Sequence, residues 1–257
     1  MIKIKRTKCP DCLKKLPEKF SKADLENGKL REALLDMQHN KCCYCEKDIS
    51  DSGKTGKNVE HYIPSSDASF KDAAGKIRWG LANDWSNLMY SCSECNNRKL
   101  DKPPVNPKTK VTLLINPTDS SVDPEDELDF VLEDICYSYN PEGKTQLGKT
   151  TCGILEFEKR TDLRISLIRE ATKIRELMSK LGEAILAQNK TKIIEKLNDF
   201  KKATSAHQNF AAFRRALIVK EFKTLNDKIL PEYEKILDKK LKKIKPPSLI
   251  GATTCFN

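Results

Sequence analysis

Two Cys-x2-Cys pairs are the feature that most restricts the fold of this 257-residue chain. Cys42 and Cys45 form one pair, and Cys92 and Cys95 form the other. Each pair has the spacing with which two thiolates hold one side of a tetrahedral zinc ion. We therefore expect the four cysteines to bind one structural zinc, whose closed coordination shell leaves no position for catalytic water. Four buried free cysteines are the alternative.

The spacing of the remaining cysteines does not decide whether the chain binds a second metal ion. Cys9 and Cys12 form a third Cys-x2-Cys pair, but its missing ligands would have to come from cysteines without that spacing, namely Cys43, Cys136, Cys152 and Cys255. Cys136 and Cys152 are instead expected at core positions on strands.

Composition bounds the compartment and the partner. The chain has 38% hydrophobic and 33% charged residues, which excludes a disordered tail and a membrane protein. It shows neither a signal peptide nor a membrane-spanning stretch, so we expect a cytoplasmic protein whose ten cysteines stay reduced. The net charge of +10 favours an anionic partner, most often nucleic acid, although membranes and acidic proteins also bind basic surfaces.

The polar residues around the cysteine pairs are the candidates for catalysis. Val59-Glu60-His61-Tyr62-Ile63-Pro64 and Trp85-Ser86-Asn87-Leu88 lie between the pairs, and Asn96-Asn97-Arg98-Lys99 follows the second. This order resembles the HNH, or ββα-metal, endonucleases. The resemblance implies that His61 is the general base, that Asn87 orients it, and that Glu60 and Asn96 bind a catalytic divalent cation.

Physical requirements agree with these roles. Phosphodiester hydrolysis needs a base near neutral pKa and a hard cation, and oxygen ligands suit Mg²⁺ or Mn²⁺. Neighbouring strand residues point to opposite faces, so Glu60 and His61 can reach one phosphate only where the strand bulges or ends. Arg98 and Lys99 are candidates for phosphate contacts, with simple solvation as the alternative. Trp79 and Trp85 are expected to pack the small core.

Helical periodicity begins after the acidic middle of the chain. Asp119 to Asp134 holds eight carboxylates with Pro124 inside, which predicts a solvated loop leading into a strand near 130–132. A long amphipathic helix is predicted from apolar positions at helical spacing: Leu163, Leu167, Ala171, Ile174, Met178, Leu181 and Ile185. Further helices are predicted around Ile194, Leu197 and Phe200, from Phe210 to Leu230, from Tyr233 to Ile244, and near the start of the chain from Lys22 to Gln38.

A closer resemblance extends past the nuclease motif. Leu113-Leu114-Ile115-Asn116-Pro117-Thr118-Asp119, the acidic strand, a turn at Gly148 and the helix from Leu163 resemble the PtuB proteins of anti-phage operons. That family implies a nuclease held in check by PtuA, an ABC-type ATPase, in Septu systems. In some retron systems it also implies a reverse transcriptase with multicopy DNA.

We therefore predict an α+β, mainly helical chain built around a ββα-metal core. The expected segments are an N-terminal arm and helix (1–38), the nuclease core with its zinc knuckle (39–105), an acidic connector with short strands (106–160) and a basic helical region (161–257). The expected function is metal-dependent endonuclease cleavage of DNA or RNA, including tRNA. An inactive zinc-stabilised binding or scaffold module is the alternative.

Overall fold

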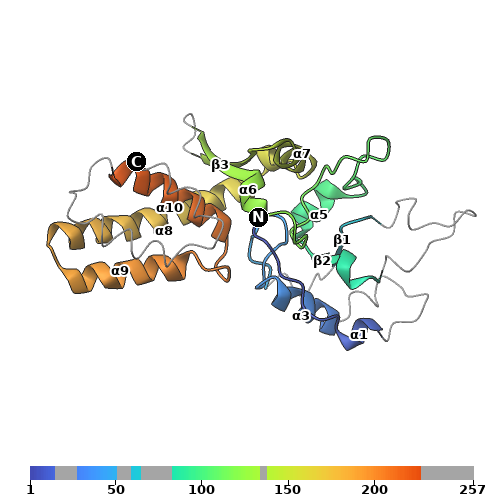
Figure 1. Cartoon of the computed structure of the whole chain (residues 1–257), viewed down its shortest axis with the longest axis horizontal. Coiled ribbons are helices and arrows are strands. Elements are labelled where there is room, and N and C mark those ends of the chain that lie inside the picture. Colours follow the sequence, from blue (N-terminus) through green and yellow to red (C-terminus); the bar gives the residue numbers. More distant parts are fainter. Residues whose placement is uncertain (15–27, 51–58, 65–82, 134–137, 227–257) are drawn as a thin grey trace, which may run out of the picture. The chain divides into compact units, whose positions relative to one another are not determined.

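The computed structural model describes residues 1–14, 28–50, 59–64, 83–133 and 138–226. The chain divides into two compact units (Figure 1). Unit 1 comprises residues 1–131 and 140–163, and unit 2 comprises residues 132–139 and those from 164 onward. The predicted N-terminal arm, zinc-knuckle core and most of the acidic connector thus lie in one unit.

A small ββα motif forms the centre of unit 1. Strand β1 (Val59–His61) pairs antiparallel with β2 (Leu88–Tyr90), so that His61 lies opposite Leu88. The 3₁₀ helix η3 (Trp85–Asn87) leads into β2, and helix α5 (Ser93–Lys99) follows it. This motif, together with the prevalence of helices, confirms the predicted α+β class.

Helix α3 (Gly28–Met37) packs against strand β2 of this motif. Its residues Leu30 and Leu34 are buried, and Gln38 just after the helix accepts a hydrogen bond from the Tyr90 backbone N–H and donates one to the Tyr90 carbonyl. The amide side chain of Gln38 therefore pairs with β2 as a neighbouring strand would. The predicted helix from Lys22 extends into residues outside the described part.

The first residues of the chain hold the other end of β2. The Arg6 guanidinium donates to the carbonyl groups of Trp85, Ser86 and Leu88 and lies 5.7 Å from the centre of the Trp85 ring. The Trp85 indole N–H donates to the Thr7 carbonyl at 2.8 Å. Trp85 is buried, as predicted, whereas Trp79 lies outside the described residues. A further short helix, α1 (Asp11–Lys14), follows this arm.

The acidic connector is more ordered than predicted. Its expected loop contains helix α6 (Pro124–Glu127), because Pro124 occupies the first helical turn, where its missing N–H costs nothing, and the Asp123 side chain caps the helix. Strand β3 (Leu128–Glu133), which confirms the predicted strand, pairs with β4 (Ser138–Gly143).

The predicted turn at Gly148 is wrong, because Gly148 lies inside helix α7 (Gln146–Ile154). A Cβ atom there would lie 2.0 Å from the Glu127 carbonyl oxygen, so the glycine is required for close packing rather than for a turn. The 3₁₀ helix η4 (Phe157–Lys159) completes the connector.

Unit 2 is built from helices α8 (Thr161–Leu186, whose first three residues belong to unit 1), α9 (Lys190–Ala203) and α10 (Ala211–Asn226). All seven predicted apolar positions of α8 are buried. In α9 the prediction was wrong by one residue: Ile193 is buried with Leu197 and Phe200, while Ile194 is exposed. Ile193, Leu197 and Phe200 follow steps of four and three, which keep them on one helical face, whereas two successive steps of three from Ile194 drift around the helix. The predicted helix Tyr233–Ile244 lies outside the described residues.

Candidate metal centre and nuclease site

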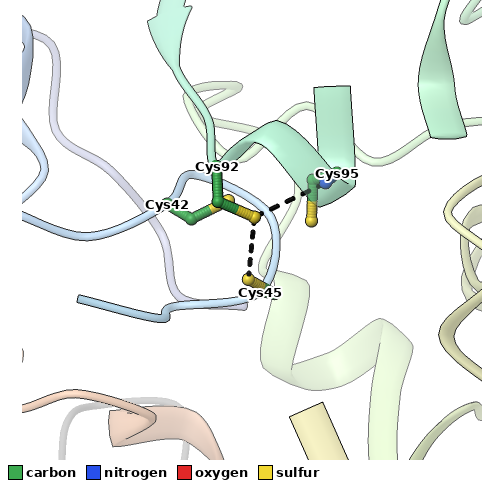
Figure 2. Close-up of side chains that lie close together, drawn as sticks. All are labelled: Cys42, Cys45, Cys92 and Cys95. Carbon is green, nitrogen blue, oxygen red and sulfur yellow. Dashed lines mark hydrogen bonds between the residues drawn. The ribbon is translucent and has the colours of Figure 1, made fainter. Parts of the chain in front are cut away.

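The four predicted zinc ligands come together in unit 1. Cys42, Cys45, Cys92 and Cys95 are all buried, and their sulfur atoms lie within 4.8 Å of one another (Figure 2). The sulfurs of Cys45 and Cys92 are 3.7 Å apart. Two thiolates bound to one tetrahedral zinc at about 2.3 Å would be separated by roughly 3.8 Å. The cluster therefore has the donor set and the dimensions for a tetrahedral metal ion.

Local backbone structure explains this convergence. Cys92 is the N-cap of α5, where its sulfur accepts the Cys95 backbone N–H at 3.4 Å, so both sulfurs lie at the start of one helix. The other pair lies in a tight loop closed by a hydrogen bond from the Cys42 N–H to the Lys47 carbonyl. The N–H of Cys43 donates to the Tyr90 carbonyl, which ties this loop to β2.

Burial and mutual contact disfavour the simultaneous ionisation of all four thiols. Burial raises the pKa of the Cys42 thiol well above its ordinary value, whereas hydrogen bonds from Cys42, Cys45 and Cys95 lower that of Cys92. One thiolate is thus stabilised by its neighbours, while four would repel one another in a buried site. A divalent metal ion is the group that allows all four thiols to ionise together.

Sequence reasoning missed the residue that contacts this cluster from the connector. The Arg160 side chain is only 1% exposed, and its Nη1 donates to the Cys95 sulfur at 3.2 Å. The same guanidinium holds the Asp162 carboxylate through Nε at 2.7 Å and Nη2 at 2.8 Å. Arg160 lies 65 residues beyond Cys95, and no motif spacing connects the two.

His61 lies at the end of β1. It is half-buried, and its carbonyl oxygen accepts a hydrogen bond from the Lys99 ammonium at 2.8 Å. Val59 and His61 are partly exposed while Glu60 between them is buried, which is the alternation of a regular strand. The imidazole therefore leaves the strand on the more exposed face.

Asn87 is buried and fixes the chain just after His61. Its side-chain oxygen accepts the Ile63 N–H at 2.8 Å, and its amide donates to the Ile63 carbonyl at 3.1 Å. Its backbone carbonyl also accepts the Tyr62 N–H at 3.0 Å. These bonds hold the exit from β1, so Asn87 positions the His61 segment through the backbone.

Glu60 and Lys99 form a buried ion pair. The Lys99 ammonium lies 2.8 Å from Glu60 Oε1, and the Tyr44 hydroxyl donates to the same oxygen at 3.2 Å. Burial nevertheless raises the pKa of Glu60, because removal from water outweighs the stabilising charge of Lys99. Lys99 is 1% exposed, so the structure places it inside the motif and not on a phosphate-facing surface.

The other two predicted residues lie on α5. Asn96 is half-buried in the middle of the helix. Arg98 is also half-buried, and its Nη1 donates to Glu156 Oε2 at 2.7 Å, with Glu94 3.9 Å away. Because acidic groups surround it, Arg98 links α5 to the connector and is not a free cation in this structure.

The other cysteines do not extend the metal centre within the described residues. Cys9 and Cys12 are partly exposed and join no cluster of three ligand-bearing side chains there. Cys152 lies on helix α7 rather than on a strand, and its thiol donates weakly to the Pro141 carbonyl at 3.7 Å. Cys136 and Cys255 lie outside the described residues.

Comparison with known proteins agrees with this geometry. Residues 42–102 match the HNH endonuclease family model, and this segment includes both cysteine pairs and the β1–β2–α5 motif. The chain therefore contains an HNH endonuclease domain.

The similarity continues outside that domain. Septu protein PtuB of Bacillus thuringiensis is 30% identical over 196 residues, which cover 74% of this chain and 66% of that protein. Septu protein PtuB of Bacillus mycoides is 28% identical over 129 residues, which cover 44% and 42% respectively. The chain thus spans about two thirds of one relative and less than half of the other. The predicted resemblance to HNH and PtuB proteins is confirmed.

No solved structure matches the chain at a significant level. None of the described helices is long and apolar enough to span a membrane.

Proposed function

We propose that this protein is a metal-dependent endonuclease that hydrolyses phosphodiester bonds of DNA or RNA, including tRNA. The observation that carries this proposal is the β1–β2–α5 motif with His61 at the end of its first strand and the four-cysteine cluster at the start of its helix. The family match over the same residues supports it.

His61 serves as the general base in this proposal. A half-buried imidazole at a strand end can accept the proton of the attacking water, and its near-neutral intrinsic pKa suits that role. Asn87 contributes by holding Ile63, which restricts the backbone on the C-terminal side of His61. Lys99 restricts the His61 carbonyl itself.

The proposal includes two metal sites, one structural and one catalytic. We assign the four cysteines to a structural Zn²⁺, because thiolates at tetrahedral spacing suit that ion. We assign Glu60 and Asn96 to a catalytic Mg²⁺ or Mn²⁺, which when bound would stabilise charge on the phosphate. Of the two carboxylate oxygens of Glu60, only Oε1 has polar partners among the described residues. Hydrogen bonds to one carboxylate oxygen orient the other for a ligand.

The relatives support a proposal for the biological setting. Their name, Septu protein PtuB, supports a role in a Septu-type anti-phage defence complex with a PtuA-like ABC-type ATPase. A reverse transcriptase with multicopy DNA, as in retron systems, stays a prediction from the family resemblance. Arg98 and Lys99, the predicted phosphate contacts, are better assigned to holding α5, because both already bond carboxylates.

The test is cleavage by the full chain, alone and with its operon ATPase. Supercoiled plasmid and total RNA are incubated with Mg²⁺, with Mn²⁺ or with a chelator of divalent ions. We expect metal-dependent cuts in one of the two substrates in at least one of these mixtures. Zinc-loaded, folded protein that binds nucleic acid but cuts neither substrate in any mixture would favour the inactive binding or scaffold module.

A further inference from the structure

Arg160 is a buried cation beside the cysteine cluster, and all three of its guanidinium nitrogens donate hydrogen bonds. Its guanidinium reaches the Cys95 sulfur through Nη1 and the Asp162 carboxylate through Nε and Nη2. Burying an arginine is costly unless its charge is balanced and its N–H groups are bonded. The Asp162 carboxylate balances one side of the ion, so the contact with Cys95 needs its own explanation.

The charge of the cluster supplies that explanation. Four thiolates around one divalent ion leave a net charge of about minus two in a site whose cysteines are all buried. A hydrogen bond from a guanidinium to a thiolate sulfur offsets part of that charge and fixes the direction of the sulfur lone pairs. Loss of a group in this outer position typically costs about 10- to 100-fold in metal affinity or activity.

The geometry points to Arg160 as the charge-compensating and positioning partner of the Cys95 thiolate in the metal-bound protein. This inference rests on the proposed metal site at the four cysteines but not on nuclease activity. Asp162 orients the guanidinium for this contact through two parallel hydrogen bonds.

The same contacts connect the metal centre to the first turn of α8. Arg160 directly precedes that helix, and Asp162 lies in its first turn. The ammonium of Lys47, two residues beyond Cys45, lies 3.4 Å from Asp162 Oδ2, the oxygen that also accepts from Arg160 Nη2. The loop of the first cysteine pair and the helix of the second are therefore both bonded to residues 160–162. Metal binding at the cluster would therefore fix the position of residues 160–162.

The test measures metal affinity in the full-length chain. Zinc content is determined first, and affinity is then measured by competition with a chromogenic chelator and by Co²⁺ titration of the thiolate absorption bands. The variants are Arg160→Met, Arg160→Lys and Asp162→Asn. Arg169→Met is the control, because Arg169 is an exposed arginine on the same α8 helix.

We expect Arg160→Met to weaken metal affinity by about 10- to 100-fold, as for other outer groups of metal sites. Arg160→Lys and Asp162→Asn should lose less, because each retains a cation near Cys95, and Arg169→Met should match the wild type. Wild-type affinity in folded Arg160→Met would overturn the inference. A wild-type protein without metal would instead refute the proposed zinc site.

Discussion

The Glu60–Lys99 pair shows how strongly a single buried contact constrains the motif. The Lys99 ammonium bonds both Glu60 and the His61 carbonyl, so it fixes two consecutive residues of β1 from helix α5. From the sequence, Lys99 was a candidate for phosphate contact. Spacing alone could not reveal its orientation, because a short helix leaves open which of its residues face the sheet.

We expect Lys99→Met to destabilise unit 1 by about 3 to 5 kcal/mol, because it leaves the Glu60 carboxylate buried without its counter-ion. The double variant Lys99→Met, Glu60→Gln removes the unpaired charge and should recover a substantial part of that loss. Chemical denaturation of the three proteins measures the difference. Equal stability of wild type and Lys99→Met would show that the pair contributes nothing to the fold.

Helix α8 is the element whose core-facing positions were most completely predicted from the sequence. Its periodicity identified seven of its eight buried apolar positions, all but Ala184, because a long amphipathic helix repeats the same signal over many turns. Shorter elements carried less information. In α9 two adjacent isoleucines made the face ambiguous, and Gly148 indicated a turn although it serves close packing with Glu127.

This description of α8 predicts that substituting two of its isoleucines will reduce the stability of the protein by different amounts. Ile174 is 1% exposed and Ile168 is 37% exposed. Ile174→Ala should cost about 2 to 5 kcal/mol by leaving a cavity. Ile168→Ala should change stability by about 0.5 kcal/mol or less. Helical circular dichroism during denaturation follows both variants, and similar effects would mean that α8 buries a different face.

The candidate site was predictable where residues close in sequence carry the signal. The two cysteine pairs were identified from local spacing, and the structure assembles these cysteines as predicted. His61 and Asn87 were singled out by the resemblance to HNH endonucleases, whose motif is also local in sequence. Arg160, Tyr44 and Glu156 were missed because each meets its partner only through the tertiary fold. The direction in which Arg98 and Lys99 point was hidden for the same reason.

At the scale of the whole molecule, the division into two units predicts a localised response to metal loss. The cysteine cluster belongs to unit 1, while unit 2 buries its own aliphatic and aromatic side chains. Structural zinc binding contributes roughly 10 to 16 kcal/mol in small peptide domains. Unit 1 should therefore depend on the metal, whereas the helices of unit 2 should not.

Cys92→Ser is the variant that tests this division. We expect loss of zinc and of hydrogen-exchange protection around β1, β2 and α5, with protection retained in α9 and α10. Cys152→Ser is the matched control, since Cys152 lies on α7 outside the cluster. Loss of protection throughout unit 2 as well would show that the two units fold as one.

The central claim, that this chain cleaves nucleic acid with His61 as its base, is tested most directly by Mg²⁺-dependent cleavage rates of His61→Ala and His207→Ala. His207 is an exposed histidine between α9 and α10, so its loss controls for removing an imidazole. We expect His61→Ala to cut about 10²- to 10⁴-fold more slowly, as for loss of a general base. Its zinc content and thermal stability should stay unchanged, and His207→Ala should match the wild type. A His61→Ala protein that cuts as fast as the wild type would contradict the account.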